Sequence, residues 1–171
     1  ENGSGKTTLM NILAGIYKPD SGEIFVNGKN VAINSPEDAL KLGIGMIHQH
    51  FKLVENYTAA DNIILGSKQS FFLKKERKDE VRRLSEKYKL DINPDKKIYD
   101  MSVSEKQTVE ILKVLYRGAN ILILDEPTAV LTPQETKKLF DILRNMKQAG
   151  CAIVIITHKL AEVKEISDRV T

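Results

Sequence analysis

The chain of 171 residues has the length and composition of one globular domain, with 42% hydrophobic and 29% charged residues. Lysine and arginine number 26 against 23 aspartates and glutamates, and the net charge of +3 is too balanced to indicate binding to nucleic acid or to an anionic membrane surface. The longest apolar run that we find, Cys151–Ile156, is too short to span a bilayer.

Hydrophobic periodicity and turn residues divide the first 66 residues into predicted elements. These are a helix over residues 6–17, an antiparallel hairpin over residues 23–33, a short helix from Ser35 to Gly43, a strand over residues 44–47 and a helix from Thr58 to Gly66. Ser35 is followed by proline at the first helical position, and Thr58 is followed by an acid three residues later. Both patterns are typical of helix N-termini.

The rest of the chain is predicted to alternate helices with apolar strands. The elements are a helix over residues 74–89, a polar linker over residues 90–100, a long helix over residues 105–117, a strand over residues 121–124, a helix from Thr132 to about Gly150, a strand over residues 152–156 and a last helix from about Lys159. The helix over residues 74–89 is dense in charge of both signs. Because its acids interleave with its bases, we interpret it as a solvated amphipathic helix, with nucleic-acid binding as the alternative.

The two strands over residues 121–124 and 152–156 are apolar throughout. Strands of this kind are typical of parallel sheets covered on both faces, so we expect both strands to be fully buried. Cys151, the only cysteine, precedes the second strand and is expected to be a buried, reduced thiol with no role in metal binding. Strands that alternate with helices at these lengths predict an α/β fold with a parallel sheet.

The N-terminus matches the phosphate-binding pattern G-x-x-x-x-G-K-[ST] over the run Asn2-Gly3-Ser4-Gly5-Lys6-Thr7-Thr8, except that the first glycine would precede Glu1. Gly3 and Gly5 let the main chain turn tightly and bring its N–H groups to phosphate oxygens. Lys6 supplies a positive charge for the β- and γ-phosphates, and the Thr7 hydroxyl is a ligand for Mg²⁺. The helix that follows directs its positive end at the anion. The alternative is a glycine–serine turn before an ordinary amphipathic helix.

Two acids, Asp125 and Glu126, follow the predicted strand over residues 121–124. Ligands of open α/β sheets bind at this end of the strands. A bound nucleotide with Mg²⁺ needs a carboxylate beside the metal, and hydrolysis needs a base for water. Asp125 suits the first role and Glu126 the second. The alternative is a pair of solvated acids in a turn.

Two more strand ends carry polar residues that suit nucleotide chemistry. His158 is placed to donate a hydrogen bond to the γ-phosphate, although a histidine there can also be structural. Gln49 is placed to orient the attacking water or to reach the metal. Its neighbours His48 and His50 are expected to face solvent or to pack, since no cysteine or acid pattern accompanies them as metal ligands.

In this order, the phosphate loop and the strand-end groups resemble the nucleotide-binding domain of ABC transporters. By that resemblance, residues 2–8 correspond to the Walker A loop, Gln49 to the Q-loop glutamine, Asp125 to the Walker B acid, Glu126 to the catalytic glutamate and His158 to the switch histidine. The family signature, usually LSGGQ, has its counterpart in Met101-Ser102-Val103-Ser104-Glu105-Lys106-Gln107. The resemblance implies that Ser102 and Ser104 contact a nucleotide held by a second domain.

The signature segment departs from the family pattern at three positions. Val103 and Ser104 replace the glycine pair, and Glu105 stands where glutamine is usual. Val103 is compatible with the branch of simple-sugar and nucleoside importers, which residues 49–54, 111–119 and 126–135 also resemble. Ser104 does not fit even there, and we expect Glu105 to place a negative charge beside the partner's nucleotide. The alternative is that Ser104 and Gln107 form a capping box and only begin a helix.

The resemblance implies an α/β fold of the P-loop NTPase (RecA-like) type. Its parallel core would comprise residues 1–50 and 117–171, with an antiparallel β element at residues 23–33 and an inserted helical subdomain at residues 51–116 that contacts a permease. The chain resembles the first of two tandem domains, trimmed at both ends. We therefore expect the isolated piece to be inactive.

The resemblance also implies function. The full polypeptide would bind ATP and Mg²⁺ and hydrolyse ATP to energise import of simple sugars or nucleosides, as a peripheral protein on the cytoplasmic face of the cell membrane. Its partners would be a second nucleotide-binding domain, permease subunits and, indirectly, a solute-binding protein, with no nucleic acid. The alternatives are a soluble ABC ATPase without a permease and a regulatory domain that binds ATP with weak turnover.

Overall fold

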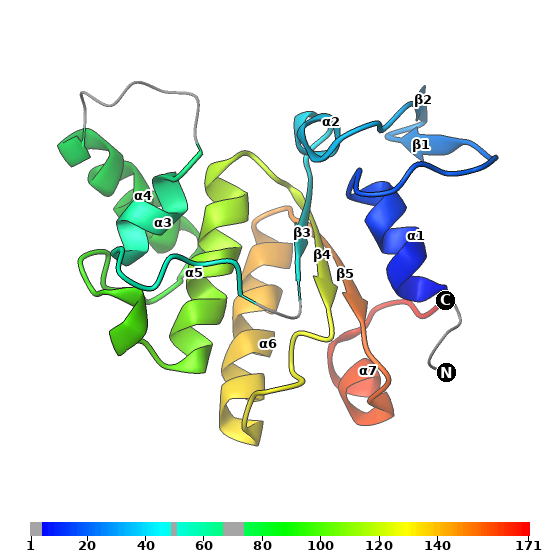
Figure 1. Ribbon diagram of the computed structural model, residues 1–171. Helices are drawn as coiled ribbons and strands as arrows, with labels where there is room; N and C mark the ends of the chain where they lie inside the picture. Colours follow the sequence, from blue (N-terminus) through cyan, green and yellow to red (C-terminus); the bar gives the residue numbers. More distant parts are fainter. Residues whose placement is uncertain (1–4, 49–50, 67–73) are drawn as a thin grey trace.

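The computed structural model describes residues 5–48, 51–66 and 74–171 (Figure 1). Its elements are α1 (Lys6–Leu13), β1 (Ile24–Val26), β2 (Lys29–Val31), α2 (Pro36–Lys41), β3 (Ile44–Ile47), α3 (Ala59–Ile64), α4 (Lys74–Tyr88), the 3₁₀ turn η1 (Ile98–Asp100), α5 (Val103–Tyr116), β4 (Ile121–Asp125), α6 (Pro133–Gln148), β5 (Ala152–Ile156) and α7 (Leu160–Ile166). The predicted helices and strands are confirmed in type and order. α1 ends earlier than expected because the chain turns at Gly15, whose φ is 73°.

A parallel sheet in the order β3-β4-β5 forms the centre of the fold. Ile44 of β3 pairs with Ile121 of β4, and Ile121 pairs with Ala152 of β5. β4 lies between the other two strands, and its residues 122–124 are buried as predicted.

The prediction that β5 is fully buried is wrong. Only Ile156 of this strand is buried, while Ala152 and Val154 are exposed. Among the described residues β5 is an edge strand, paired on one side with β4. Ile153 and Ile155 pack against the core on one face, whereas Ala152 and Val154 are exposed on the other.

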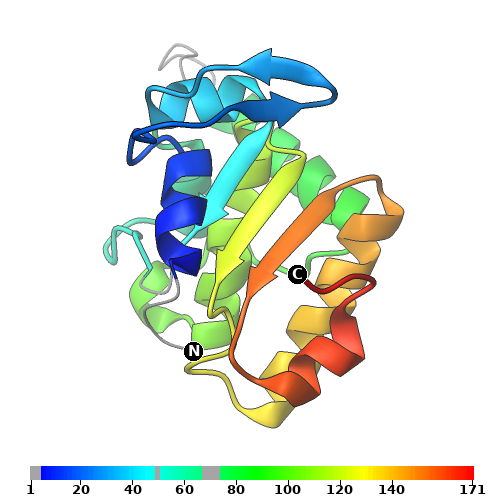
Figure 2. The same cartoon turned by 90° about the vertical axis from the view of Figure 1, so that its right-hand side faces the viewer.

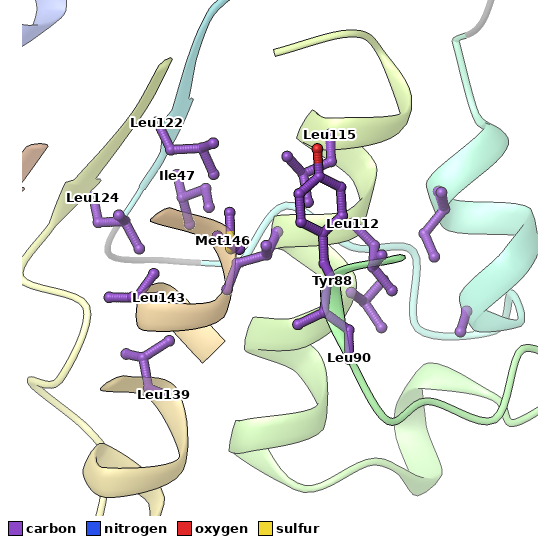
Figure 3. Packing of buried hydrophobic residues seen from close by; sticks show 14 of the residues in the cluster. Ile47, Tyr88, Leu90, Leu112, Leu115, Leu122, Leu124, Leu139, Leu143 and Met146 are labelled. Carbon is purple, nitrogen blue, oxygen red and sulfur yellow. The ribbon is translucent and has the colours of Figure 1, made fainter. Parts of the chain in front are cut away.

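Two hydrophobic clusters cover opposite faces of the sheet. The larger one fills the space between the sheet, α5 and α6 and extends to α3 and α4, with Leu122, Leu124, Leu143 and Met146 among its members (Figure 3). The smaller one joins Ile44 and Ile123 to α1, α2 and the β1–β2 hairpin. The helix predicted to be amphipathic and solvated, α4, buries Val81 and Tyr88 in the larger cluster.

The hairpin β1–β2 is antiparallel, as predicted, and pairs Ile24 with Val31 and Val26 with Lys29. Its two-residue loop, Asn27-Gly28, takes φ angles of 52° and 76°, which is the geometry that favours asparagine followed by glycine. The segment predicted as a polar linker is more ordered than expected. Leu90 and Ile98 within it are buried, and Thr58 forms an isolated bridge with Lys97.

Residues 52–54, which we name the strap, lead from the end of β3 towards α3 along α5 (Figure 1). Glu110 of α5 accepts a hydrogen bond from the N–H of Lys52 at 2.6 Å, and Lys113 donates one to the carbonyl of Lys52 at 2.7 Å. Asn62 of α3 accepts from the N–H of Val54 at 2.7 Å and donates to its carbonyl at 3.1 Å. Side chains of two different helices therefore satisfy the main-chain groups of Lys52 and Val54.

We expect Glu110→Leu to destabilise the domain by about 3–5 kcal/mol, because it leaves the charge of Lys113 buried without its partner. The side chains of Glu110 and Lys113 are 10% and 12% exposed, their charged groups lie 3.8 Å apart, and burial lowers the pKa of Lys113. Thermal unfolding of the full-length protein and amide exchange at Lys52 measure the effect. Glu110→Gln separates the two contacts, since it also removes the charge beside Lys113 while its amide oxygen still accepts from Lys52, so it should destabilise less than Glu110→Leu. Equal stability of wild type and Glu110→Leu would contradict the prediction.

Candidate functional site

The predicted site residues gather at one edge of the sheet. The arrowheads of β3, β4 and β5 and the N-terminal end of α1 all lie towards the same end of the molecule (Figure 2). α1 is held there by Met10 and Leu13, which pack against the cluster around Ile44 and Ile123. A helix N-terminus beside the carboxyl ends of parallel strands is the arrangement in which α/β folds bind phosphates.

The described part of the phosphate loop begins at Gly5, which has a φ of 80° and is the N-cap of α1. Lys6, Thr7 and Thr8 form the first turn of this helix and are exposed. Asn2, Gly3 and Ser4 lie outside the described residues. The helix therefore begins where the pattern predicts, with its cation and hydroxyls on the accessible first turn.

Glu126 and His158 are in direct contact at the ends of β4 and β5. Nδ1 of His158 lies 2.8 Å from Oε1 of Glu126. The Glu126 side chain is 20% exposed and that of His158 is 66% exposed. The pair therefore lies at the protein surface, with the carboxylate more deeply buried than the imidazole. The sequence placed these residues 32 positions apart and predicted both at strand ends, but it did not predict that they would touch.

Glu126 has two unusual features. Its φ is 48°, in the left-handed region that residues other than glycine seldom adopt. Its second oxygen, Oε2, is buried and has no hydrogen-bond partner among the described residues. Buried carboxylate oxygens normally have partners, so an unsatisfied one at a ligand-binding edge indicates a group that meets its partner only with ligand or water present.

The residues at this edge also suit a magnesium ion that accompanies a nucleotide. Mg²⁺ takes oxygen ligands and is usually bound by one or two carboxylates together with phosphates and waters. Asp125, at the end of β4, is half-buried and supplies one carboxylate, and the Thr7 hydroxyl supplies another oxygen. Among the described residues no group of three or more histidines, cysteines, aspartates or glutamates is arranged to hold a metal by itself.

Gln49 and His50 lie outside the described residues, so their predicted places stay predictions. His48, at the end of β3, is half-buried, as expected for a packing residue. Burial is the main cause that lowers its pKa. The nearby charge of Lys52 lowers this pKa further, while those of Glu110 and Asp125 raise it.

The signature segment begins α5, and the structure corrects how it does so. The N-cap is Ser102, whose hydroxyl accepts from the N–H of Glu105 at 3.3 Å, while the Glu105 carboxylate accepts from the N–H of Ser102 at 2.8 Å. The predicted capping box of Ser104 and Gln107 is therefore wrong by two residues. Ser102 is the better cap because the acid three residues later completes the reciprocal pair.

The negative charge of Glu105 is paired within the chain, and its expected place beside a partner's nucleotide stays a prediction. Its carboxylate accepts hydrogen bonds from Nζ of Lys96 at 2.7 and 2.9 Å. The bond to Lys96 is the main cause that holds the pKa of Glu105 below its usual value, so the carboxylate stays ionised and paired. Sequence reasoning missed Lys96 because it lies nine residues away, on the segment before η1.

A family model described as ABC transporter matches residues 1–129. The chain belongs to the ABC transporter family. No helix of the described ABC domain is long and apolar enough to cross a membrane.

Relatives of this ABC domain include import proteins from several bacteria. The Nucleoside import ATP-binding protein NupA of Lactococcus lactis subsp. cremoris (strain MG1363) is 52% identical, and the Guanosine import ATP-binding protein NupO of Bacillus subtilis (strain 168) is 56% identical. The Ribose import ATP-binding protein RbsA 2 of Escherichia coli O157:H7 is 41% identical. Each alignment covers 100% of this chain and 34% of the relative. The chain thus spans about a third of the length of these relatives.

Solved structures share the fold of the ABC domain. An ATP-binding cassette of an ABC transporter in its ADP conformation has a TM-score of 0.84 and 26% identity, and covers 98% of this chain and 71% of its own. The structure of cbiO1 from Clostridium perfringens, part of the ABC transporter complex cbiONQ, has a TM-score of 0.82 and 29% identity, and covers 98% of this chain and 68% of its own. The predicted P-loop NTPase fold is confirmed, while the roles of single site residues and the subdomain boundaries stay predictions.

Proposed function

We propose that this chain is an ATP-binding and ATP-hydrolysing domain of an ABC importer for nucleosides or simple sugars. The observation that carries the hydrolytic part is the contact of His158 with Glu126 at the edge where the N-terminus of α1 lies. The names of the relatives support import. Since the relatives named for nucleoside or guanosine import are 52% and 56% identical and those named for ribose import 41% and 44%, nucleosides are the first choice.

In this proposal the residues of α1 and β4 bind the nucleotide. Lys6 neutralises phosphate charge, together with the main-chain N–H groups of residues 2–8 and the positive end of α1. Thr7 and Asp125 would hold Mg²⁺, with Gln49 as a further ligand or a guide for water. When bound, the ion stabilises negative charge on the phosphates.

Glu126 then acts as the general base. As an ionised carboxylate it accepts the proton of the attacking water, and its left-handed backbone presents the side chain at the strand end. His158 orients this carboxylate through Nδ1, which leaves Nε2 for the γ-phosphate. A neutral imidazole donates from one nitrogen only, so donation to both Glu126 and the phosphate requires the charged form of His158.

The wider assembly belongs to the same proposal. Residues 1–50 and 117–171 would form the ATP-binding core and residues 51–116 the helical subdomain that faces permease subunits. A second nucleotide-binding domain would supply the signature that completes the site, and Ser102 and Ser104 of this chain would serve that domain in return. The protein would lie at the cytoplasmic face of the cell membrane and act with a solute-binding protein.

Reconstitution tests the proposal directly. The full-length protein is purified with the permease subunits encoded beside it, placed in proteoliposomes and assayed for ATP hydrolysis and for uptake of labelled guanosine and labelled ribose. We expect ATP-dependent uptake of one of them and hydrolysis that the permease stimulates. An ATP hydrolysis rate that does not change when the permease is present would favour a soluble ABC ATPase. Nucleotide binding without turnover would favour a regulatory domain.

Ser104→Gly is expected to raise turnover of the assembled complex a few-fold without changing the ATP affinity of the single domain. The Cβ of Ser104 stands near the start of α5, where a partner's phosphate would approach main-chain N–H groups. Steady-state turnover and calorimetric binding are measured side by side. Ser104→Ala is the matched control, because it removes the hydroxyl and keeps the Cβ. An equal gain in both variants, or none in either, would contradict the role of the Cβ. Glu105 is left unchanged, since it caps α5.

A further inference from the structure

We propose that Thr128, Lys159 and Glu162 are positioning residues that hold Glu126 and His158 in their working geometry. The inference rests on the proposed function, because it concerns the same hydrolytic pair. The side-chain hydrogen bonds and the ion pair of these three residues do not involve Glu126 or His158. They act on the two loops that carry the pair, one after β4 and one after β5.

The starting observation is that Glu126 needs support. A left-handed φ of 48° is unfavourable for a residue with a Cβ, and a buried oxygen without a partner adds a further cost. Such a conformation persists only where the surrounding structure over-determines it. The main chain supplies part of the support, since the N–H of Glu126 donates to the carbonyl of Ile156 at 2.9 Å and its carbonyl accepts from Ala129 at 3.1 Å.

The rest of the support comes from a closed ring of three side chains, those of Thr128, Lys159 and Glu162. Thr128 lies two residues after Glu126. The Thr128 hydroxyl donates to Oε2 of Glu162 at 2.7 Å and accepts from Nζ of Lys159 at 3.1 Å. Lys159 also contacts Oε1 of Glu162 at 3.1 Å, which closes the ring. The ammonium also donates to the main-chain carbonyl of Thr128 at 3.0 Å, so Lys159 makes two hydrogen bonds to Thr128 and an ion pair with Glu162.

The same ring fixes the residues on either side of His158. Lys159 follows it directly, and its N–H donates to the hydroxyl of Thr157 at 3.1 Å. That hydroxyl in turn donates to Oε2 of Glu162 at 3.4 Å. His158 itself is exposed, so its position is set by these two anchored neighbours and by Glu126.

Burial indicates that the ring has a positional role. Thr128 is 0% exposed, and the side chain of Glu162 is 13% exposed. Burying a carboxylate is costly, and an apolar cluster of the same volume is often as stable. The side chain of Lys159 is 37% exposed, so its ammonium keeps contact with water. A partly buried ring that ties the loop after β4 to the loop after β5 is therefore best explained by the geometry it imposes on the pair between them.

The test uses two variants of one residue in the full-length protein assembled with its permease. Thr128→Val keeps the volume and removes the hydroxyl, whereas Thr128→Ser keeps the hydroxyl and removes a methyl group. We expect Thr128→Val to lower kcat at least tenfold with the KM for ATP changed less than twofold, and Thr128→Ser to retain most of the wild-type kcat. A packing role predicts the opposite order. Wild-type kcat in Thr128→Val, or a larger loss in Thr128→Ser, overturns the proposal.

A second variant and a control keep the test decisive. Lys159→Met alters a partly exposed side chain and is expected to lower kcat about tenfold, because it breaks the same ring. If Thr128→Val fails to fold, Lys159→Met decides alone. A wild-type kcat in Lys159→Met would then overturn the proposal. Ser85→Ala is the matched control. It removes a buried hydroxyl that donates to the carbonyl of Leu90 on the helical side of the molecule, and should leave kcat unchanged.

The action through Glu126 has its own readout. In the Glu126→Gln background, single-turnover hydrolysis should show a smaller further loss on adding Thr128→Val, because one of the two groups being positioned is already gone. A full additional loss there would show that Thr128 acts elsewhere, and would overturn the proposal. If the wild-type complex itself hydrolyses no ATP, the proposed function fails first, so the two failures are distinguishable.

Discussion

Glu126→Gln in the full-length protein is expected to lower ATP turnover by about 10²–10⁴-fold, the usual contribution of a general base. The amide has the size of the carboxylate and can still accept a hydrogen bond from Nδ1 of His158, so the local structure should persist. It cannot take the proton of the attacking water. ATP binding should therefore remain, and the ATP-bound state of the assembled domains should accumulate.

Steady-state turnover and calorimetric ATP binding measure the two parts of this prediction. Glu165→Gln is the matched control, because Glu165 is an exposed acid of α7 paired with Arg144. Its turnover should equal that of the wild type. If Glu126→Gln hydrolysed ATP within a few-fold of the wild-type rate, another group would have to be the base.

Lys6→Ala is expected to weaken ATP binding by at least about tenfold while the melting temperature of the protein without nucleotide stays unchanged. A hydrogen bond to a charged group contributes about 1.5–3 kcal/mol, which corresponds to roughly 10–150-fold in affinity. Lys6 is exposed in the first turn of α1, so its removal leaves the core intact.

Lys18→Ala controls for the loss of one positive charge near α1, since Lys18 is an exposed residue beyond the end of that helix. Its ATP affinity should match that of the wild type. An equal loss of ATP affinity in both variants would mean that Lys6 acts only through net charge. Unchanged ATP affinity in Lys6→Ala would show that the phosphate loop does not bind the nucleotide through Lys6.

Much of the fold was predictable because it depends on local signals. The continuous apolar run of β4 and the acids that follow Ser35 and Thr58 each specify one local structure, and the structure contains all of them. The ends of β4 and β5 followed from the same patterns. Parallel strands with helical crossovers then bring Glu126 and His158 to one edge.

The failures depend on contacts between distant residues. β5 has the same apolar composition as β4, and sequence could not tell that it would lie at the edge of the described sheet. Ser102 rather than Ser104 caps α5 because Glu105 is held in place by Lys96, and the bonds of Lys159 and Glu162 to Thr128 span about 30 residues. A capping acid three residues after Ser102 was the one local signal that could have corrected the first of these.

The most direct test of the central claim is a structure of the full-length protein with magnesium and a non-hydrolysable ATP analogue. We expect the triphosphate at the N-terminus of α1, the metal between Thr7 and Asp125, and Glu126 and His158 facing the γ-phosphate. A nucleotide bound away from the carboxyl ends of β3, β4 and β5, or a Glu126 that faces away from the γ-phosphate, would contradict it.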